Sequence, residues 1–201
     1  MADDKIDWDH VYESNYKSKL FWDIHWIHKA RDLYKSAQLL EPELLKVWDS
    51  YREKSKNLSA KILPDYYQGA YFMLIAFAIE NLFKAVAVRN NRFLYQKNFE
   101  QTKKFPKELQ EHDLTKLAQI ARLTFSEQEE DLMRRLSRSA IWYGRYPVPI
   151  KYEDESGNQL FSDGVERSVS WFSRNDISHL NTFILSLPTR FGYSEDYCSF
   201  I

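Results

Sequence analysis

The chain has 201 residues, of which 16% are aromatic, five are glycine and six are proline. This length is enough for one domain with a substantial core, and the scarcity of glycine and proline favours helices joined by few tight turns. The formal net charge of −1 excludes a global field that attracts nucleic acid, and a single cysteine, Cys198, excludes an internal disulfide. The acidic start lacks the apolar stretch of a signal peptide, so we expect a cytoplasmic protein.

The first quarter of the chain predicts two helices after a polar segment. Residues 1–16 are polar, and we expect them to be poorly ordered ahead of a single helical domain over residues 17–201. Apolar residues recur at helical spacing over residues 18–40 and again over 43–56. Pro42 lies between these stretches and predicts a break there.

The helix expected over residues 18–40 carries two histidines and two tryptophans. His25 and His28 lie three residues apart, but no HExxH pattern or cysteine ligand accompanies them. We therefore expect neither a metal ion nor a cofactor. Trp22 and Trp26 would mark a partner surface if they are exposed.

Residues 64–89 form the most apolar stretch and predict a core helix. The stretch is apolar on every side from Ala70 to Ile79, which is typical of a helix surrounded by other elements. At about 100° per residue, Glu80 and Lys84 continue a stripe that begins as core. They form either a structural ion pair or the lining of a polar pocket. Because these polar groups interrupt the run, we expect no membrane segment.

Residues 89–107 are polar and aromatic, and Asn90-Asn91 predicts the end of the core helix. Basic and aromatic side chains alternate along this segment: Arg92, Lys97, Lys103, Lys104 and Lys107 with Phe93, Tyr95, Phe99 and Phe105. Such interleaving binds nucleic acid through phosphate contacts and stacking. The alternative is a solvated loop whose aromatic residues fold back onto the bundle.

Further helices are predicted within residues 111–123, 126–143 and 165–187. Asp113 is a good N-cap for the first, and Ser126 with Glu129 makes a capping box for the second. A turn-rich connection over residues 148–164 separates the second helix from the third.

Short motifs follow one another across these helices: Glu80 and Lys84 as ExxxK, His112-Asp113-Leu114, and Arg145-Tyr146-Pro147. In this order they resemble the HEPN superfamily, the higher-eukaryote and prokaryote nucleotide-binding domains. The resemblance covers roughly residues 66–187. It implies an all-α fold, an antiparallel bundle of about six helices, which forms a homodimer.

A further motif, R-x4-H, runs from Arg174 to His179 on the last helix, with Asn175 after the arginine. The resemblance implies that these residues belong to a metal-independent endoribonuclease, the toxin of a toxin–antitoxin or phage-defence system. Arg174 then binds the RNA phosphate, His179 transfers a proton and Asn175 orients the group. A five-residue step turns about 140° around a helix, so the site is built more easily across the two-fold axis of a dimer.

Two alternatives stay open. The R-x4-H spacing is weak by itself, and in a sibling group the RYP ending supplies the arginine. The chain is then a non-catalytic module that binds a nucleotide or a protein partner through Lys84, His112 and Arg145. In the nuclease interpretation Glu80 and Lys84 instead support the site from the core helix, and a protein partner such as an antitoxin is expected. In the other alternative His179 makes a core contact and Arg174 a surface ion pair.

Overall fold

The computed structural model describes residues 6–146, 158–160, 166–168 and 172–194. Within this part of the chain, six α-helices pack into a bundle, which confirms the predicted all-α fold. The helices are α1 (Trp8–Phe21), α2 (Asp23–Lys56), α3 (Gln68–Thr102), α4 (Leu114–Ile120), α5 (Glu127–Arg138) and α6 (Arg174–Arg190). Shorter elements are the helical turns η1 (Lys107–Gln110) and η2 (Ser139–Tyr143) and the antiparallel strands β1 (Asn158–Leu160) and β2 (Glu166–Ser168).

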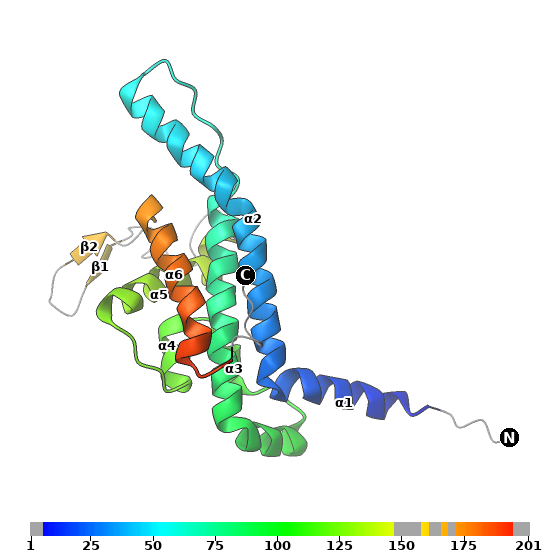
Figure 1. Cartoon of the computed structure of the whole chain (residues 1–201). Coiled ribbons are helices and arrows are strands. Elements are labelled where there is room, and N and C mark those ends of the chain that lie inside the picture. The colour runs from blue at the N-terminus through cyan, green and yellow to red at the C-terminus, as the bar shows by residue number, and fades with distance from the viewer. Residues whose placement is uncertain (1–5, 147–157, 161–165, 169–171, 195–201) are drawn as a thin grey trace.

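The long antiparallel helices α2 and α3 form the axis of the molecule, and α4, α5 and α6 lie beside α3 (Figure 1). From Tyr71 to Val88, α3 is buried on nearly all sides, as predicted for a core helix. By length and composition α3 is apolar enough to cross a membrane, but 78% of its apolar stretch is buried inside the fold. This burial is what the core helix of a soluble protein shows.

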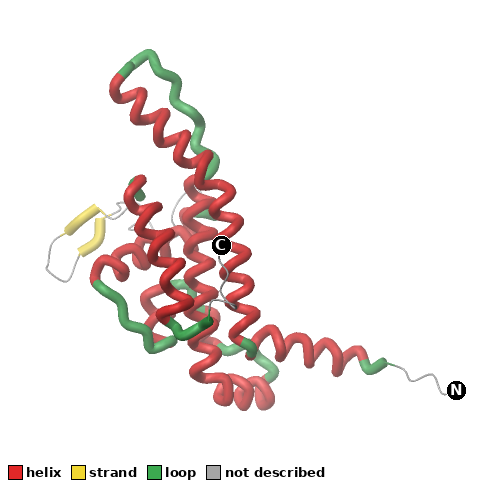
Figure 2. Tube along the Cα trace, in the orientation of Figure 1, coloured by secondary structure: helices red, strands yellow, loops and turns green. Residues whose placement is uncertain are grey.

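Helix α1 begins at Trp8, inside the segment expected to be poorly ordered, and extends away from the bundle (Figure 2). The Asp7 carboxylate accepts a hydrogen bond from the His10 N–H at 3.1 Å and caps the helix start. Trp8 stacks on Tyr12 one turn later, with ring centroids 6.0 Å apart. A cap and an i,i+4 aromatic pair therefore favour helix in a stretch whose polarity suggested none.

Helix α2 is continuous although Pro42 lies inside it, so the predicted break at this proline is wrong. Proline in a helix interior removes one hydrogen bond and costs about 3 kcal/mol. Ala37 before it and Leu44 after it are both fully buried in the same core. Packing of this apolar face against the rest of the bundle offsets the local cost.

The predicted helix end at Asn90-Asn91 is a kink instead. Asn91 has non-helical angles, φ −122° and ψ 18°, and α3 then resumes to Thr102. The Asn91 side-chain amide donates to the Ala87 carbonyl oxygen, one turn before it, at 2.9 Å. The basic and aromatic segment is thus mostly helix rather than loop, and it buries Tyr95 and Phe99.

The local signals for α4 and α5 are confirmed. The Asp113 carboxylate accepts from the N–H groups of Thr115 and Lys116, and Ser126 with Glu129 forms the capping box. Each cap satisfies backbone donors that a helix start leaves unpaired.

Helix α6 begins at Arg174, nine residues later than predicted, because part of the preceding segment pairs as strands. Ser173 and Asp176 form a capping box at its start, and Asp176 also accepts from Arg135 of α5 at 2.8 Å. Burial opposes ionisation of Asp176, but the hydrogen bonds from Arg135 and Ser173 outweigh it and lower the pKa of this carboxyl.

Replacing Asp176 by asparagine is expected to lower the free energy of unfolding by about 2 kcal/mol at neutral pH, since a charge-assisted hydrogen bond is lost. Because the pKa of Asp176 is lower in the folded protein than its ordinary value of 3.8, its carboxylate stabilises the fold fully above pH 3.8. This contribution is lost as the pH falls below that value. The difference between wild type and variant should therefore shrink in acid, as urea unfolding near pH 7 and near pH 3 will measure. The exposed Asp32→Asn is the control, and equal effects of the two substitutions would refute the assignment.

Candidate functional site

Glu80 and Lys84 form a buried ion pair one turn apart on α3, as their spacing predicted. Glu80 Oε1 lies 2.6 Å from Lys84 Nζ, and the side chains are 7% and 5% exposed. Two charges at this depth are tolerated because each compensates the other.

His112, just before the start of α4, extends this pair toward solvent. Its Nδ1 lies 3.0 Å from Glu80 Oε2, and its side chain is 49% exposed. A carboxylate only accepts hydrogen bonds, so Nδ1 carries the proton that it donates to Glu80. In the neutral imidazole, Nε2 is then an acceptor for water or a ligand. A buried carboxylate that orients a half-exposed imidazole is an arrangement suited to proton transfer or to binding a hydrogen-bond donor.

Arg145 lies against the same stripe of α3. Its guanidinium is 5.8 Å from the ring centroid of Phe77, one turn before Glu80, and it donates to the Ile141 carbonyl at 2.9 Å and to that of Ala140. The structure therefore brings the ExxxK, HDL and arginine elements of the predicted polar pocket to one face of α3. Pro147, the last residue of the RYP motif, lies outside the described residues.

The absence of a side chain at Gly144 allows the backbone just after η2 to pack closely against α3. A Cβ added there would lie 2.5 Å from Met73 Cβ and 2.9 Å from the Gly69 carbonyl oxygen. Both obstacles belong to α3 close to its backbone, so a longer side chain can be accommodated only if η2 moves away from α3.

Gly144→Ala is expected to destabilise the fold by about 1–3 kcal/mol through overpacking. Because Met73 Cβ and the Gly69 carbonyl remain, adding Met73→Ala should not restore the lost stability. Thermal unfolding of the single and double variants measures both effects. Unchanged stability of Gly144→Ala would contradict this close packing.

The R-x4-H residues lie on α6, on its solvent side. Arg174, Asn175 and His179 are exposed, whereas Ile177 and Leu180 between and beside them are buried. The Arg174 guanidinium pairs with Asp49 of α2, and both side chains are about half exposed. Arg174 thus makes the surface ion pair that one alternative expected, and its guanidinium is still accessible to solvent. His179 is not a core contact.

Beside Arg174 lies a surface pocket of about 340 Å³ that the sequence analysis missed. It is lined by Trp48, Asp49, Tyr51, Arg52, Phe172, Ser173 and Arg174. The i, i+3 and i+4 spacing of Trp48, Tyr51 and Arg52 on one helix was its signal in the sequence. Its other wall comes from more than 100 residues away, which no local pattern reveals.

A polar network near α6 was also missed. Glu41 of α2 accepts hydrogen bonds at 3.1 Å from the Tyr71 hydroxyl and the Asn181 amide, and Tyr34 donates to Asn181 at 3.1 Å. Burial, reinforced by the Glu41 charge, raises the pKa of both tyrosines, which keeps their hydroxyls as neutral donors. The network fastens α6 to α2 and α3.

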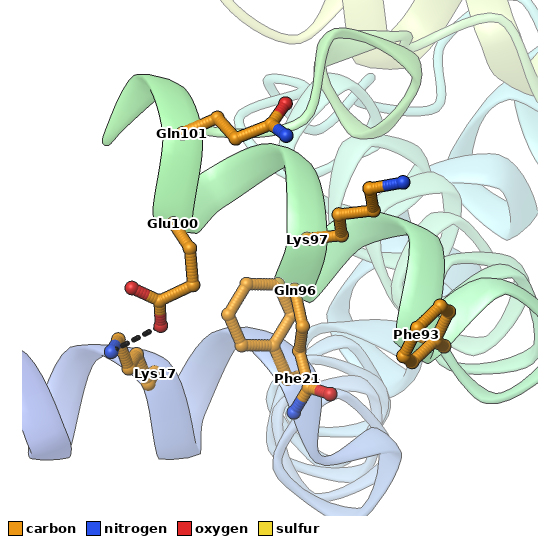
Figure 3. A pocket seen from close by; sticks show the side chains of 7 residues that line it. All are labelled: Lys17, Phe21, Phe93, Gln96, Lys97, Glu100 and Gln101. Atoms are coloured by element: carbon orange, nitrogen blue, oxygen red, sulfur yellow. Dashed lines mark ion pairs between the residues drawn. The ribbon is translucent and has the colours of Figure 1, made fainter.

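The basic and aromatic segment of α3 forms one wall of a second pocket, of about 490 Å³, against α1 (Figure 3). Phe93, 81% exposed, and Lys97 lie at this pocket. Lys17 of α1 pairs with Glu100 at 2.5 Å and Lys103 pairs with Glu13 at 2.5 Å. These carboxylates neutralise Lys103, one of the five basic residues of the segment, together with Lys17 of α1.

The two tryptophans differ in exposure. Trp22 is 56% exposed beneath the Arg92 guanidinium. Trp26 is partly buried and donates its indole N–H to the Leu20 carbonyl at 3.0 Å. Trp22 alone therefore fits the expected partner surface.

His25 and His28 are both exposed on α2. Among the described residues there is no group of three or more histidine, cysteine, aspartate or glutamate side chains placed to hold a metal ion. Cys198 lies outside these residues. Comparison of the chain with models of known protein families, with curated proteins and with solved structures found no match.

Proposed function

We propose that the chain is a HEPN-like, metal-independent endoribonuclease that works as a homodimer. The observation that carries the proposal is the simultaneous exposure of Arg174, Asn175 and His179 on α6, whose opposite face is buried in the core. A rigid helix fastened to two others presents these groups to solvent, where a substrate can reach them.

The chemistry is transesterification within the RNA. The ribose 2′-oxygen attacks the adjacent phosphorus, a P–O2′ bond forms and the P–O5′ bond breaks. His179 accepts the 2′-OH proton and returns it to the leaving 5′-oxygen. In a two-fold dimer, His179 of one subunit meets Arg174 of the other, so each dimer has two such sites. Arg174 binds the phosphate and stabilises the charge that develops on it.

The ion pair between Arg174 and Asp49 is consistent with this role. Exposed pairs of this kind contribute between about 0 and 1 kcal/mol, so a phosphate can displace the carboxylate at little cost. We place such a nuclease in the cytoplasm, as the toxin of a toxin–antitoxin or phage-defence system held in check by a partner protein.

The direct test is incubation of the purified protein with single-stranded RNA in the presence of EDTA. The proposal expects fragments that end in a 2′,3′-cyclic phosphate, because no external water attacks the phosphorus in the first step. Intact RNA at every concentration of dimer would refute it.

A second function is favoured by the contact of His112 with the Glu80–Lys84 pair and by Arg145, whose guanidinium lies over Phe77, one turn before Glu80 on the same helix. In this case the chain is a non-catalytic module that binds a nucleotide or a protein there. His112→Ala would then abolish binding of a nucleoside phosphate while RNA stays intact with wild type and variant alike.

A further inference from the structure

The pocket beside Arg174 has stiff aromatic walls. Phe172 stacks on the buried Phe72 with centroids 3.7 Å apart, and Trp48 stacks on the same ring at 6.3 Å. The Trp48 indole N–H donates to Gln68 at 3.0 Å. Tyr51 lies at the pocket with 45% of its surface exposed. Walls held in this way lose little conformational entropy when a planar ligand binds.

Two arginines line the same pocket, and they differ in whether an acidic side chain pairs with them. Arg174 pairs with Asp49, whereas no acidic side chain in the described part of the chain pairs with the exposed Arg52. The capping box at the start of α6 occupies the N–H groups of Ser173 and Asp176. The cationic groups that line the pocket are the guanidinium groups of Arg52 and Arg174, so an anion is bound first by Arg52 and then by Arg174 if Asp49 is displaced.

We propose that this pocket is a nucleotide subsite for single-stranded RNA, with Asp49 as a built-in competitor of the phosphate. The base stacks on the exposed aromatic lining at Tyr51, and Arg52 and Arg174 bind the phosphates on either side of the nucleotide. The pocket volume of about 340 Å³ lies in the range typical of small-molecule sites. This subsite rests on the proposed function, since Arg174 links it to the phosphate that is cleaved.

If Asp49 competes with the RNA phosphate for Arg174, substitutions of neighbouring residues should have opposite effects on RNA affinity. Arg52→Gln should weaken RNA binding about three- to tenfold and reduce its salt dependence by about one phosphate contact. Tyr51→Ala should weaken binding about five- to a hundredfold through lost stacking. Asp49→Asn should strengthen binding about three- to tenfold, because it releases the Arg174 guanidinium for the phosphate. The gain should exceed that of Glu43→Gln, which removes a paired carboxylate from the same helix outside the pocket and reports only the general loss of charge repulsion.

The measurement is the binding of a fluorescently labelled oligoadenylate to the full chain carrying His179→Ala, which keeps the RNA intact. Lys46→Gln is the matched control, since it removes one exposed positive charge from the same helix outside the pocket. Inorganic phosphate and single-stranded DNA serve as competitors. Circular dichroism and thermal unfolding verify that each variant is folded.

Weaker binding by Arg52→Gln than by Lys46→Gln, together with tighter binding by Asp49→Asn, supports the subsite. The proposal is overturned if Asp49→Asn weakens binding, if Arg52→Gln equals its control, or if inorganic phosphate at matched concentration displaces the oligonucleotide as well as unlabelled RNA does. If wild type cleaves no RNA yet the variants follow the expected order, the nuclease proposal fails and the subsite stands. If wild type cleaves RNA but the variants do not follow the expected order of binding, the subsite proposal fails and the nuclease proposal stands.

Discussion

His179→Ala is expected to lower RNA cleavage by about 10²- to 10⁴-fold, the range for loss of a general acid or base. The residue is exposed on α6, and no hydrogen bond or ion pair of its side chain is found within the described structure. Its removal should therefore leave the unfolding temperature unchanged within about 1 °C. Initial rates of cleavage of a labelled RNA in EDTA give the activity.

Two further substitutions on α6 separate chemistry from folding. Arg174→Ala should cost about 10²- to 10³-fold, as expected for a group that stabilises transition-state charge. Thr182→Ala is the control, because within the described residues its exposed hydroxyl donates only to the Ser178 carbonyl oxygen, at 3.0 Å. Activity that survives the loss of both Arg174 and His179 would assign cleavage to another site.

Glu80→Ala is expected to lower the free energy of unfolding by about 3–5 kcal/mol, the cost of breaking a buried ion pair. The Lys84 ammonium is then left 5% exposed without its carboxylate, and His112 loses its acceptor. Urea unfolding followed by circular dichroism measures the loss. A change below about 1 kcal/mol would show that Lys84 reaches water by another route.

The double substitution Glu80→Leu with Lys84→Met gives the sharper comparison. Replacing a buried pair by apolar residues of similar size is often neutral or stabilising, so the double variant should recover most of the stability lost in Glu80→Ala. If it folds well and also keeps the activity of wild type, the pair is structural. If it folds but no longer binds nucleoside phosphates, the polar stripe of α3 is the binding site.

Local signals in the sequence predicted those parts of the fold that local physics decides. The Asp113 cap, the Ser126 and Glu129 capping box and the stripe from Phe77 to Lys84 depend on residues within a turn or two. All three are present in the structure as expected.

Long-range packing decided what the sequence could not predict. Pro42 is tolerated in α2 because the residues around it share one buried face, and Asn91 bends α3 because Tyr95 and Phe99 beyond it pack on the bundle. The late start of α6 follows from the pairing of Glu166–Ser168 as strand β2 and from the Ser173–Asp176 capping box, which Arg135 contacts from 41 positions away.

The candidate residues show the same division. His112 and Glu80 meet across 32 residues; the resemblance to a family suggested that both belong to the site, but not that they are in contact. The pocket between α2 and α6 combines Asp49 and Arg174, which are 125 residues apart. Only the tertiary structure reveals that pairing.

Mixing two inactive variants tests most directly whether two copies of the chain bring an arginine and a histidine together in one site. If the site combines Arg174 of one subunit with His179 of the other, unfolding and refolding Arg174→Ala and His179→Ala together produces heterodimers with one intact site. Statistical mixing of a symmetric dimer then restores about a quarter of the wild-type cleavage rate. A mixture that stays as inactive as its components, while co-purification through an affinity tag on one of the two variants shows that heterodimers have formed, would contradict a site shared between subunits.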